Sequence, residues 1–573
     1  MTAAVEKKGL IDYFIRLTEF MMAITIIFDC NSVYRTMRFG VSPVLLSMIG
    51  INIFAAILIG LWVIKDRGNI ECIKEHKLLF LVSFVFVFLF YFVNASKTET
   101  LGWLEYFLFF MNLMVILFRI YRRNHDTFRI LFVIERVMIV ISVVSVILWI
   151  GSNLLELWGM NEDVFVQWGG KYYNTNYLNM CLRRWDPMYV CDIEKNLGIF
   201  CEPPMFGLML GFSIYTELFL KKKTNILTVL VFLIALLSSR AILGIMICAV
   251  AFFLKLVEMM QGKKYAKYVI CGAVLAAAAV IVGLAMFKMG NESGSFRTHI
   301  DDFVAAFKCW TNYPIFGCGY GNQDPITEYM SAFRADNLGV SNSIAVTLAE
   351  GGIVLWLYYV IPFVIMGMSF FKKNKKTAYW AAGMFLFWVG VVFHLRLLIF
   401  LILALGYSMI DLKLTEDGNG KKKIAFAIKW FDENENTEPG FFVKKPLCVP
   451  ISFRIVMMAF LVCVSGYCLI NASSMQVTDI ISAVAVLIGC VVLVLCNTGG
   501  RKTNGYINFA IECGLWLVFM LIGNLYQVLD RLYSATGLYI QDNWWTSIVQ
   551  VILMYAVGCA IEMIRENKKV SVD

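Results

Sequence analysis

The sequence predicts an all-α, polytopic integral membrane protein built as a helical bundle. Of its 573 residues, 60% are hydrophobic and only 16% are charged, which is too little polar surface for a water-soluble domain. Apolar runs of about 17–25 residues, the length of a helix that crosses a bilayer, recur along the whole chain. These runs are continuous rather than alternating, which excludes a membrane β-barrel.

The apolar runs divide the chain into a core of about twelve helices and a C-terminal block of about four. The predicted spans are 10–31, 41–64, 78–96, 101–121, 130–155, 199–219, 225–239, 240–259, 267–288, 340–371, 377–394, 395–412, 451–471, 475–496, 505–527 and 544–564. Residues 1–412 therefore form the membrane core, 413–449 a polar linker and 450–573 the C-terminal block. We find no convincing internal repeat, which disfavours a transporter built from inverted repeats.

Basic residues test this assignment, because loops on the cytoplasmic side of a membrane are enriched in Lys and Arg. With these spans, every basic cluster falls on the same side. The clusters stand at Lys7–Lys8, 65–77, 122–129, Lys221–Lys223, 255–267, 372–376, Lys421–Lys423, Arg501–Lys502 and 565–569. The pattern predicts a multi-pass protein of the cytoplasmic membrane with both termini in the cytoplasm. It also explains the formal charge of +9 without a nucleic-acid partner.

Two long polar segments, about 156–198 and 289–339, then face the outside, and the 413–449 linker faces the cytoplasm. Loops of this length are usually functional rather than simple connectors. The second segment combines a short amphipathic helix with the glycine-rich stretch YPIFGCGYGN. The apolar face predicted for its helix consists of Phe296, Ile300, Phe303, Val304 and Phe307.

Basic residues on the outside oppose the charge rule, so we expect a compensating use for them. A guanidinium keeps its charge and binds phosphate through two parallel hydrogen bonds. A convergent set would therefore hold a diphosphate and stabilise it as a leaving group. The residues concerned are Arg183, Arg184, Lys195, Arg240, Arg297, Arg334 and Arg396.

Four of these arginines also have a structural interpretation, because each stands near an acid in the sequence and an ordinary ion pair would explain it. The acids are Asp186 for Arg183 and Arg184, Asp301 for Arg297, and Asp336 for Arg334. Arg240 and Arg396 differ, because they stand in LLSSRAILG and FHLRLLIF between apolar helices. A charge at such a position is costly and usually functional.

A catalytic base and a sugar-binding surface have their own candidates. Glu202 precedes Pro203 and Pro204 at the start of an apolar helix, so it is either a helix-capping acid or a general base at the mouth of the bundle. His299 is the second candidate base, and its alternative is a solvated loop residue. Glycines allow a ligand to approach the backbone and aromatic faces stack on sugars, which favours a glycan site around Tyr320.

These features, in this order, resemble the O-antigen polymerase (Wzy) and O-antigen ligase superfamily of bacterial envelopes. The resemblance covers roughly residues 190–370 and rests on GIFCEPPMFG, the LSSR turn, a loop arginine before AFKCWTNYPIFGCGYGN, and SNSIAVTLAEGGIV. It implies glycosyl transfer from an undecaprenyl-diphosphate-linked glycan on the outer face of the cytoplasmic membrane, without a nucleotide sugar. Polymerases add the growing chain to a new lipid-linked repeat unit, whereas ligases pass it to another acceptor.

The chain departs from the family pattern at two places. Ligases carry a His-Asn pair where this chain has Ser341 and Asn342, which favours a polymerase, with Asn342 as a candidate for substrate binding. The arginine that precedes GIF in relatives is replaced here by Lys195 or Asn196.

The expected mechanism begins with an acceptor hydroxyl, activated by Glu202, that attacks the anomeric carbon and expels undecaprenyl diphosphate. Arg240, Arg297 and at least one other outer arginine meet the charge of the diphosphate. We infer no metal and no cofactor, because no acidic cluster of suitable spacing stands outside; Asp301–Asp302 is the nearest candidate.

The expected partners are the lipid-linked oligosaccharide, membrane lipid, a chain-length regulator and a flippase. Three alternatives stay open for the function of the chain itself. It would be a ligase-type glycan transferase to another acceptor, a lipid-linked oligosaccharide flippase or transporter, or a peptidoglycan polymerase of the shape-and-division type, whose motifs we do not find. A flippase is disfavoured by the two long outer loops and the scarcity of intramembrane charges.

Overall fold

The computed structural model describes residues 2–36, 43–94, 98, 100–155, 162–166, 171–175, 182–184, 194–260, 293–334, 339–372, 374–416 and 422–431. The chain divides into two compact units, Met1–Pro439 and Gly440–Asp573. The second unit lies outside the described residues, so the helices predicted for 450–573 stay a prediction. The helix predicted at 267–288 also lies outside them.

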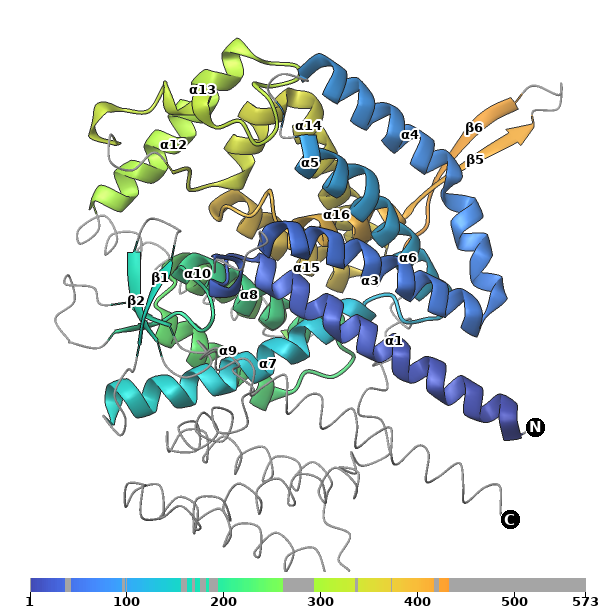
Figure 1. Ribbon diagram of the computed structural model, residues 1–573, viewed down its shortest axis with the longest axis horizontal. Coiled ribbons are helices and arrows are strands. Elements are labelled where there is room, and N and C mark those ends of the chain that lie inside the picture. Colours follow the sequence, from blue (N-terminus) through green and yellow to red (C-terminus); the bar gives the residue numbers. More distant parts are fainter. Residues whose placement is uncertain are drawn as a thin grey trace, which may run out of the picture. The chain divides into compact units, whose positions relative to one another are not determined.

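The described part of the first unit is mainly a bundle of long helices (Figure 1). They are α1 (Thr2–Asp29), α3 (Pro43–Lys65), α4 (Ile70–Asn94), α6 (Met111–Arg123), α7 (Arg129–Trp149), α8 (Pro203–Tyr215), α9 (Ile226–Ser239), α10 (Ile242–Met260), α14 (Ser343–Met368), α15 (Lys375–Gly390) and α16 (Leu397–Ser408). Within the described residues, seven helical segments are long and apolar enough to cross a membrane. A multi-pass helical membrane protein is therefore confirmed.

The remaining helical elements are short or lie outside these spans. They are α2 (Val33–Thr36), η1 (Arg67–Asn69), α5 (Thr100–Trp103), η2 (Leu104–Phe110), η3 (Ile150–Leu154), η6 (Thr216–Leu220), α12 (Ser293–Asn312), α13 (Asp324–Thr327), η7 (Ala332–Arg334) and η8 (Ser369–Lys372). The η2, η3 and η6 segments are π-helical; η2 leads into α6, and η3 and η6 continue α7 and α8.

Contacts between loops gather some of the helix ends at one end of the bundle, which we call the basic end because it carries Arg122 and Arg123. There the Asn124 side chain donates to Asn69 Oδ1 at 3.1 Å, and Arg122 Nη1 donates to the Ser408 carbonyl at 3.2 Å. The loops after α3, α6 and α16 therefore lie together.

Other contacts define the opposite end. The Leu397 backbone N–H donates to Asp29 Oδ2 at 2.7 Å, which joins the end of α1 to the start of α16. The Asn94 side chain, at the end of α4, donates to the Phe316 carbonyl at 3.0 Å. Helices α4, α6 and α16 thus run between the two ends in the alternating directions that a multi-pass chain requires.

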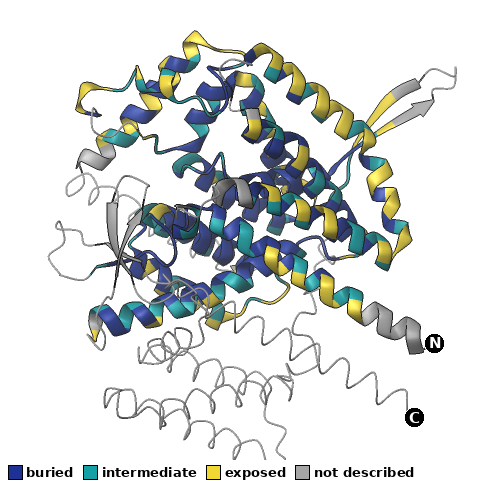
Figure 2. Ribbon diagram, in the orientation of Figure 1, coloured by how far each residue is buried: buried dark blue, intermediate teal, exposed yellow. Residues whose placement is uncertain are grey.

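Burial separates central helices from peripheral ones (Figure 2). Helix α16 is almost wholly apolar, and each of its residues except Tyr407 is buried within the bundle. The span from Arg67 to Asn94 is also strongly apolar, but only 17% of its apolar window is buried. A lipid-facing surface is apolar like the interior, so hydrophobicity alone does not distinguish these two kinds of helix.

Two small β-sheets accompany the helices of this mainly helical fold, and the sequence did not predict them. An antiparallel sheet of β1 (Glu162–Val166), β2 (Lys171–Thr175), β3 (Leu182–Arg184) and β4 (Lys195–Asn196) occupies the predicted first outer loop. A hairpin of β5 (Ile410–Glu416) and β6 (Lys422–Ile428) follows α16. The helix predicted at 395–412 therefore ends at Ser408, because IDLKLTE alternates apolar and polar side chains as a strand does.

The glycine-rich stretch packs against a break in α14, where Gly352 has φ 59°. The Cys318 N–H donates to the Ala349 carbonyl and the Gly319 N–H to the Glu350 carbonyl, both at 2.9 Å. A Cβ at Gly317 would lie 2.3 Å from the backbone of Glu350. These glycines therefore serve the close approach of two backbone segments.

The apolar face predicted for α12 is exposed and does not pack against the rest of the fold. Ile300, Phe303, Val304 and Phe307 are each more than two-fifths exposed. The buried side is made instead of Asp301, Asp302, Ala305, Ala306 and Cys309. The helix packs on α14 through this polar and small-residue side.

Candidate functional site

The segment 195–202 links two parts of the opposite end. Its Ile199 carbonyl accepts from the Val33 N–H at 2.9 Å, so it is fastened to the chain that follows α1. The Asn196 side chain donates to Ser238 Oγ at 3.1 Å, in the LSSR turn that ends α9. This irregular backbone therefore brings Glu202 and the turn of Arg240 into one region of the fold.

Glu202 is the residue before α8, and its backbone is extended. It is the N-cap residue of α8, but its side chain makes no capping hydrogen bond to the helix. Instead, Glu202 Oε1 accepts from Asn31 Nδ2 at 3.1 Å, and the Cys201 N–H donates to the Asn31 carbonyl at 2.9 Å. The carboxylate, which is partly exposed, is oriented by the segment that follows α1.

Asp29 lies two residues before Asn31 and organises a cluster of charges. Its side chain is fully buried and accepts from Arg35 Nε at 3.0 Å. The other carboxylate oxygen accepts from the Leu397 N–H, in the first turn of α16. A carboxylate at a helix N-terminus is favourable, because the unpaired backbone N–H groups there carry partial positive charge.

Arg396, the residue before α16, completes this cluster, which we call the Arg35–Asp29–Arg396 cluster. Arg396 is 8% exposed, and its charge is attracted by Asp29 and repelled by Arg35. Among the described residues, no acceptor hydrogen-bonds to its guanidinium. The cluster thus holds two guanidinium groups around one carboxylate, with unused donors on Arg396.

Arg240 follows the last residue of α9 in the left-handed conformation, with φ 50°. Such a backbone is uncommon for a residue with a side chain and ends the helix abruptly. The side chain is partly buried. The structure therefore fixes Arg240 at a sharp turn between α9 and α10, as the sequence predicted.

Arg240 and Arg396 stand at the ends of two apolar helices, α9 and α16, that are short for a membrane span. α9 has 14 residues and α16 has 12, which gives about 21 Å and 18 Å of helix. Both helices reach the basic end, where Lys221 pairs with Glu135 and Arg122 contacts Ser408. Each helix is therefore shorter than the roughly 30 Å hydrocarbon core of a bilayer.

A second group of candidates lies on α12 and the segment after it. The Arg297 guanidinium stacks 4.7 Å from the Phe333 ring. Arg334 is 1% exposed, and its Nη1 lies 2.6 Å from Asp302 and 3.6 Å from Asp301. Arg334 thus clamps its own loop onto α12, which favours a structural role. His299, on the same helix, is partly exposed.

The two acids beside Arg334 have opposite electrostatic environments. Burial raises the pKa of the Asp302 carboxyl above its ordinary value, in spite of its pairing with Arg334. Burial would raise the pKa of Asp301 as well, but two hydrogen bonds from Ser331 and attraction to Arg334 lower it. Asp301 therefore favours its charged form in the fold.

Two candidates from the sequence are buried within the core. The Tyr320 side chain is 1% exposed and meets the rings of Trp103 and Phe107 edge to face. Asn342 is also 1% exposed, and it caps α14 by accepting from the Ala345 N–H at 3.0 Å. Both have clear structural functions, so we leave them out of the proposed site.

Arg183 and Arg184 lie on β3, opposite Asn196 and Lys195 of β4. Their side chains lie outside what the structure describes, so their assignment stays a prediction. Among the described residues, no group of three His, Cys, Asp or Glu side chains is placed to hold a metal ion.

Sequence reasoning missed Asp29, Asn31 and Arg35, which belong to FDCNSVYR at the end of the first apolar run. A sequence cue was available, because Asp29 closes that run and Arg35 is another arginine on the predicted outer side. It also missed Glu350, which is fully buried at the break in α14. Its Oε2 accepts from the Gly321 N–H at 3.1 Å and lies 3.4 Å from His394 Nε2.

The fold and this site define a class: a polytopic membrane protein that gathers charged side chains at the ends of its apolar helices. Residues 224–360 match the family described as O-antigen ligase. The match confirms that this part of the chain is similar to the O-antigen ligase and polymerase superfamily, as the sequence motifs predicted. The match runs from just before α9 into α14 and includes Arg240, Arg297 and Arg334. No curated protein matches the chain.

Proposed function

We propose that the protein is a bacterial cell-surface polysaccharide polymerase of the cytoplasmic membrane. It would transfer a glycan of O-antigen, capsule or exopolysaccharide from an undecaprenyl-diphosphate-linked donor to a lipid-linked repeat unit, on the outer face. One observation carries the proposal: Glu202 is hydrogen-bonded to Asn31, two residues from the Arg35–Asp29–Arg396 cluster at the start of α16. Buried charges among apolar helices are costly and usually mark a functional site.

The cluster suits an anionic leaving group. Asp29 neutralises one of the two guanidinium groups, which leaves a net positive charge close to donors that lack an acceptor. A diphosphate would supply those acceptors and take the charge that develops as the glycosidic bond breaks. Arg240 would add a further guanidinium, beside that of Arg396, from the turn after α9.

Glu202 would act as the general base. Its carboxylate would take the proton of the acceptor hydroxyl while the hydroxyl oxygen attacks the anomeric carbon. The bond from that carbon to the diphosphate would break, with its electron pair departing on the diphosphate. Asn31 would hold the carboxylate in place through the 3.1 Å hydrogen bond.

The exposed apolar side of α12 would serve the lipid part of the donor. Ile300, Phe303 and Phe307 form an apolar strip, and Arg297 on the same helix is exposed. A polyprenyl chain along this strip would place its diphosphate near an arginine on the way to the cluster. His299 stays the second candidate base.

A ligase is the second candidate function, because the matched family carries that description. Ser341, where ligases have a histidine, favours the polymerase. The partners would be the lipid-linked donor and acceptor, with a flippase to supply them and a chain-length regulator.

The test is a chromosomal deletion in the native host, complemented with wild type or with Glu202→Gln. Loss of a polymerase leaves single repeat units on lipid outside the membrane, and loss of a ligase leaves long polymer on lipid. Loss of a flippase leaves repeat units protected from an added glycosidase. Glu258→Gln, a paired glutamate at the end of α10, is the matched control. Normal polysaccharide in the deletion strain would contradict the proposed function, and full rescue by Glu202→Gln would contradict Glu202 as base.

A further inference from the structure

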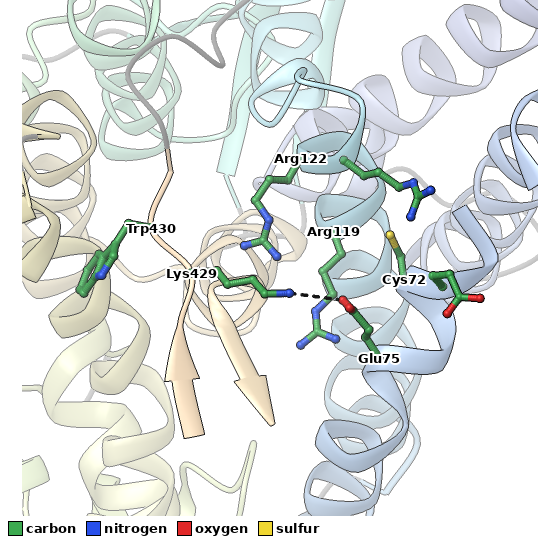
Figure 3. Close-up of a pocket in the computed structure, with 8 residues that line it drawn as sticks. Cys72, Glu75, Arg119, Arg122, Lys429 and Trp430 are labelled. Carbon is green, nitrogen blue, oxygen red and sulfur yellow. Dashed lines mark ion pairs between the residues drawn. The ribbon is translucent and has the colours of Figure 1, made fainter. Parts of the chain in front are cut away.

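A cavity of about 480 Å³ opens at the basic end of the bundle. The Arg35–Asp29–Arg396 cluster lies at the opposite end. Figure 3 shows the cavity between the first turns of α4, the last turn of α6 and the residues that follow β6. Basic side chains outnumber acidic ones in its lining: Arg119, Arg122, Arg123 and Lys429 face Glu71 and Glu75. The proposed glycosyl transfer uses none of these residues.

Arg119 is the most informative of them. It is 3% exposed, and its Nη2 donates to the Ile410 carbonyl at 2.6 Å. Its Nε and Nη1 are buried and have no hydrogen-bond partner among the described residues. Buried charged donors without acceptors are costly, which points to an acceptor that a ligand brings into the cavity.

The acidic residues of the lining are already paired with lysines. Glu75 lies 3.5 Å from both Lys413 and Lys429, and Figure 3 shows the second of these pairs. Glu71 is paired with Lys74 at 2.8 Å. These carboxylates are therefore engaged by ammonium groups, and the arginines of α6 keep their positive charge.

A purely structural role accounts for only part of this arrangement. Arg119 and Arg122 each donate to a carbonyl near the end of α16, at Ile410 and Ser408. These bonds fasten the β5–β6 hairpin to α6, and cations are favoured beside helix C-termini. They use one nitrogen of Arg119 and do not explain why its other donors are enclosed beside a cavity.

We propose that this cavity binds the phosphate group of an anionic ligand. A phosphate offers several acceptor oxygens to the planar guanidinium forks, and the excess positive lining supplies the attraction. The same chemistry is found in a soluble phosphorylated compound and in the headgroup of an anionic phospholipid. Because Lys429 and Trp430 line the cavity, the bound phosphate would contact the residues that follow β6, within the 413–449 segment.

The experiment uses the full-length protein in nanodiscs of neutral phosphatidylcholine, titrated with inorganic pyrophosphate at constant ionic strength. Calorimetry should give saturable binding that is at least about 10-fold weaker in Arg119→Met. Arg123→Met, at an exposed position of the same lining, is the second variant in case the first does not fold. Lys223→Met, at an exposed basic residue outside the lining, should bind like wild type. Arg396→Met separates this site from the proposed diphosphate site at the other end.

A lipid arm distinguishes the source of the phosphate. Protein reconstituted with phosphatidylglycerol is delipidated mildly, and the lipids retained are counted by native mass spectrometry. Retention by wild type and loss in Arg119→Met or Arg123→Met, without pyrophosphate binding, identifies a headgroup site. Equal weakening in Lys223→Met reduces the effect to general surface charge and overturns the proposal. Absence of binding in both arms overturns it as well.

Discussion

Arg396→Met separates a functional guanidinium from a structural one, because activity should fall while stability is kept or increased. Arg396 is 8% exposed, and among the described residues no acceptor hydrogen-bonds to its guanidinium. Its attraction to Asp29 is opposed by repulsion from Arg35. Replacing a buried and poorly compensated charge by an apolar side chain of similar length is often neutral or stabilising. We therefore expect the free energy of unfolding to stay within about 1 kcal/mol of wild type or to increase.

The activity should fall steeply in the same variant. If Arg396 stabilises the departing diphosphate, its removal should lower the rate by about 10²–10³-fold, as for the loss of one oxyanion donor. The assay measures polymer formed per folded molecule in membranes supplied with the host's lipid-linked repeat units, beside thermal unfolding in detergent. Arg396→Lys keeps the charge without the fork and should retain an intermediate rate.

Arg35→Met is the matched control, because Arg35 is the cluster arginine that pairs with Asp29 at 3.0 Å. Its loss leaves a fully buried carboxylate without that partner, so this variant should lose stability. The reasoning is refuted if Arg396→Met loses stability and activity in parallel, or if it keeps wild-type activity.

The remaining predictions concern the outer segment and α14. Arg334→Met should destabilise the fold by about 3–5 kcal/mol because it leaves Asp302 buried and unpaired; adding Asp302→Asn should recover part of the loss in thermal unfolding, and an unchanged Tm would contradict the clamp. Gly352→Ala should prevent normal folding, since φ is 59° and a Cβ would lie 2.3 Å from a backbone oxygen; Gly367→Ala, with open space around its Cα, should unfold like wild type. The fold lowers the pKa of Asp301. Its contribution to stability is therefore present above the pKa of the unfolded state and is lost as the pH falls through the pKa of the folded state. Asp301→Asn should flatten the acid side of the Tm-versus-pH curve.

The helices of the core could be predicted closely from the sequence. The predicted span 41–64 corresponds to α3 at 43–65, and 225–239 corresponds to α9 at 226–239. Such accuracy follows from physics, because a bilayer demands long apolar segments with all backbone groups hydrogen-bonded within the helix. The same rule singled out Arg240 and Arg396, since a charge within an apolar run is rare at any position in a chain.

Periodicity alone could not decide which way a face points. Phe303 and Phe307 share a face of α12 in the sequence, but this face is exposed, and Asp302 lies on the packed side. Tyr320 looked like an accessible aromatic residue in a polar loop, and it is buried against Trp103. In a protein whose lipid-facing surface is also apolar, hydrophobicity marks helices without showing their neighbours.

The sequence by itself determined a polytopic membrane protein with arginines between its apolar helices and a carboxylate before paired prolines. Only the tertiary structure brought Asp29 of α1 to the first turn of α16, which lies 368 residues further along the chain. Likewise, only the fold oriented Glu202 through Asn31. The physical reason is that each contact is a hydrogen bond between a charged or polar group and a partner distant in the sequence. Local sequence patterns do not identify such partners.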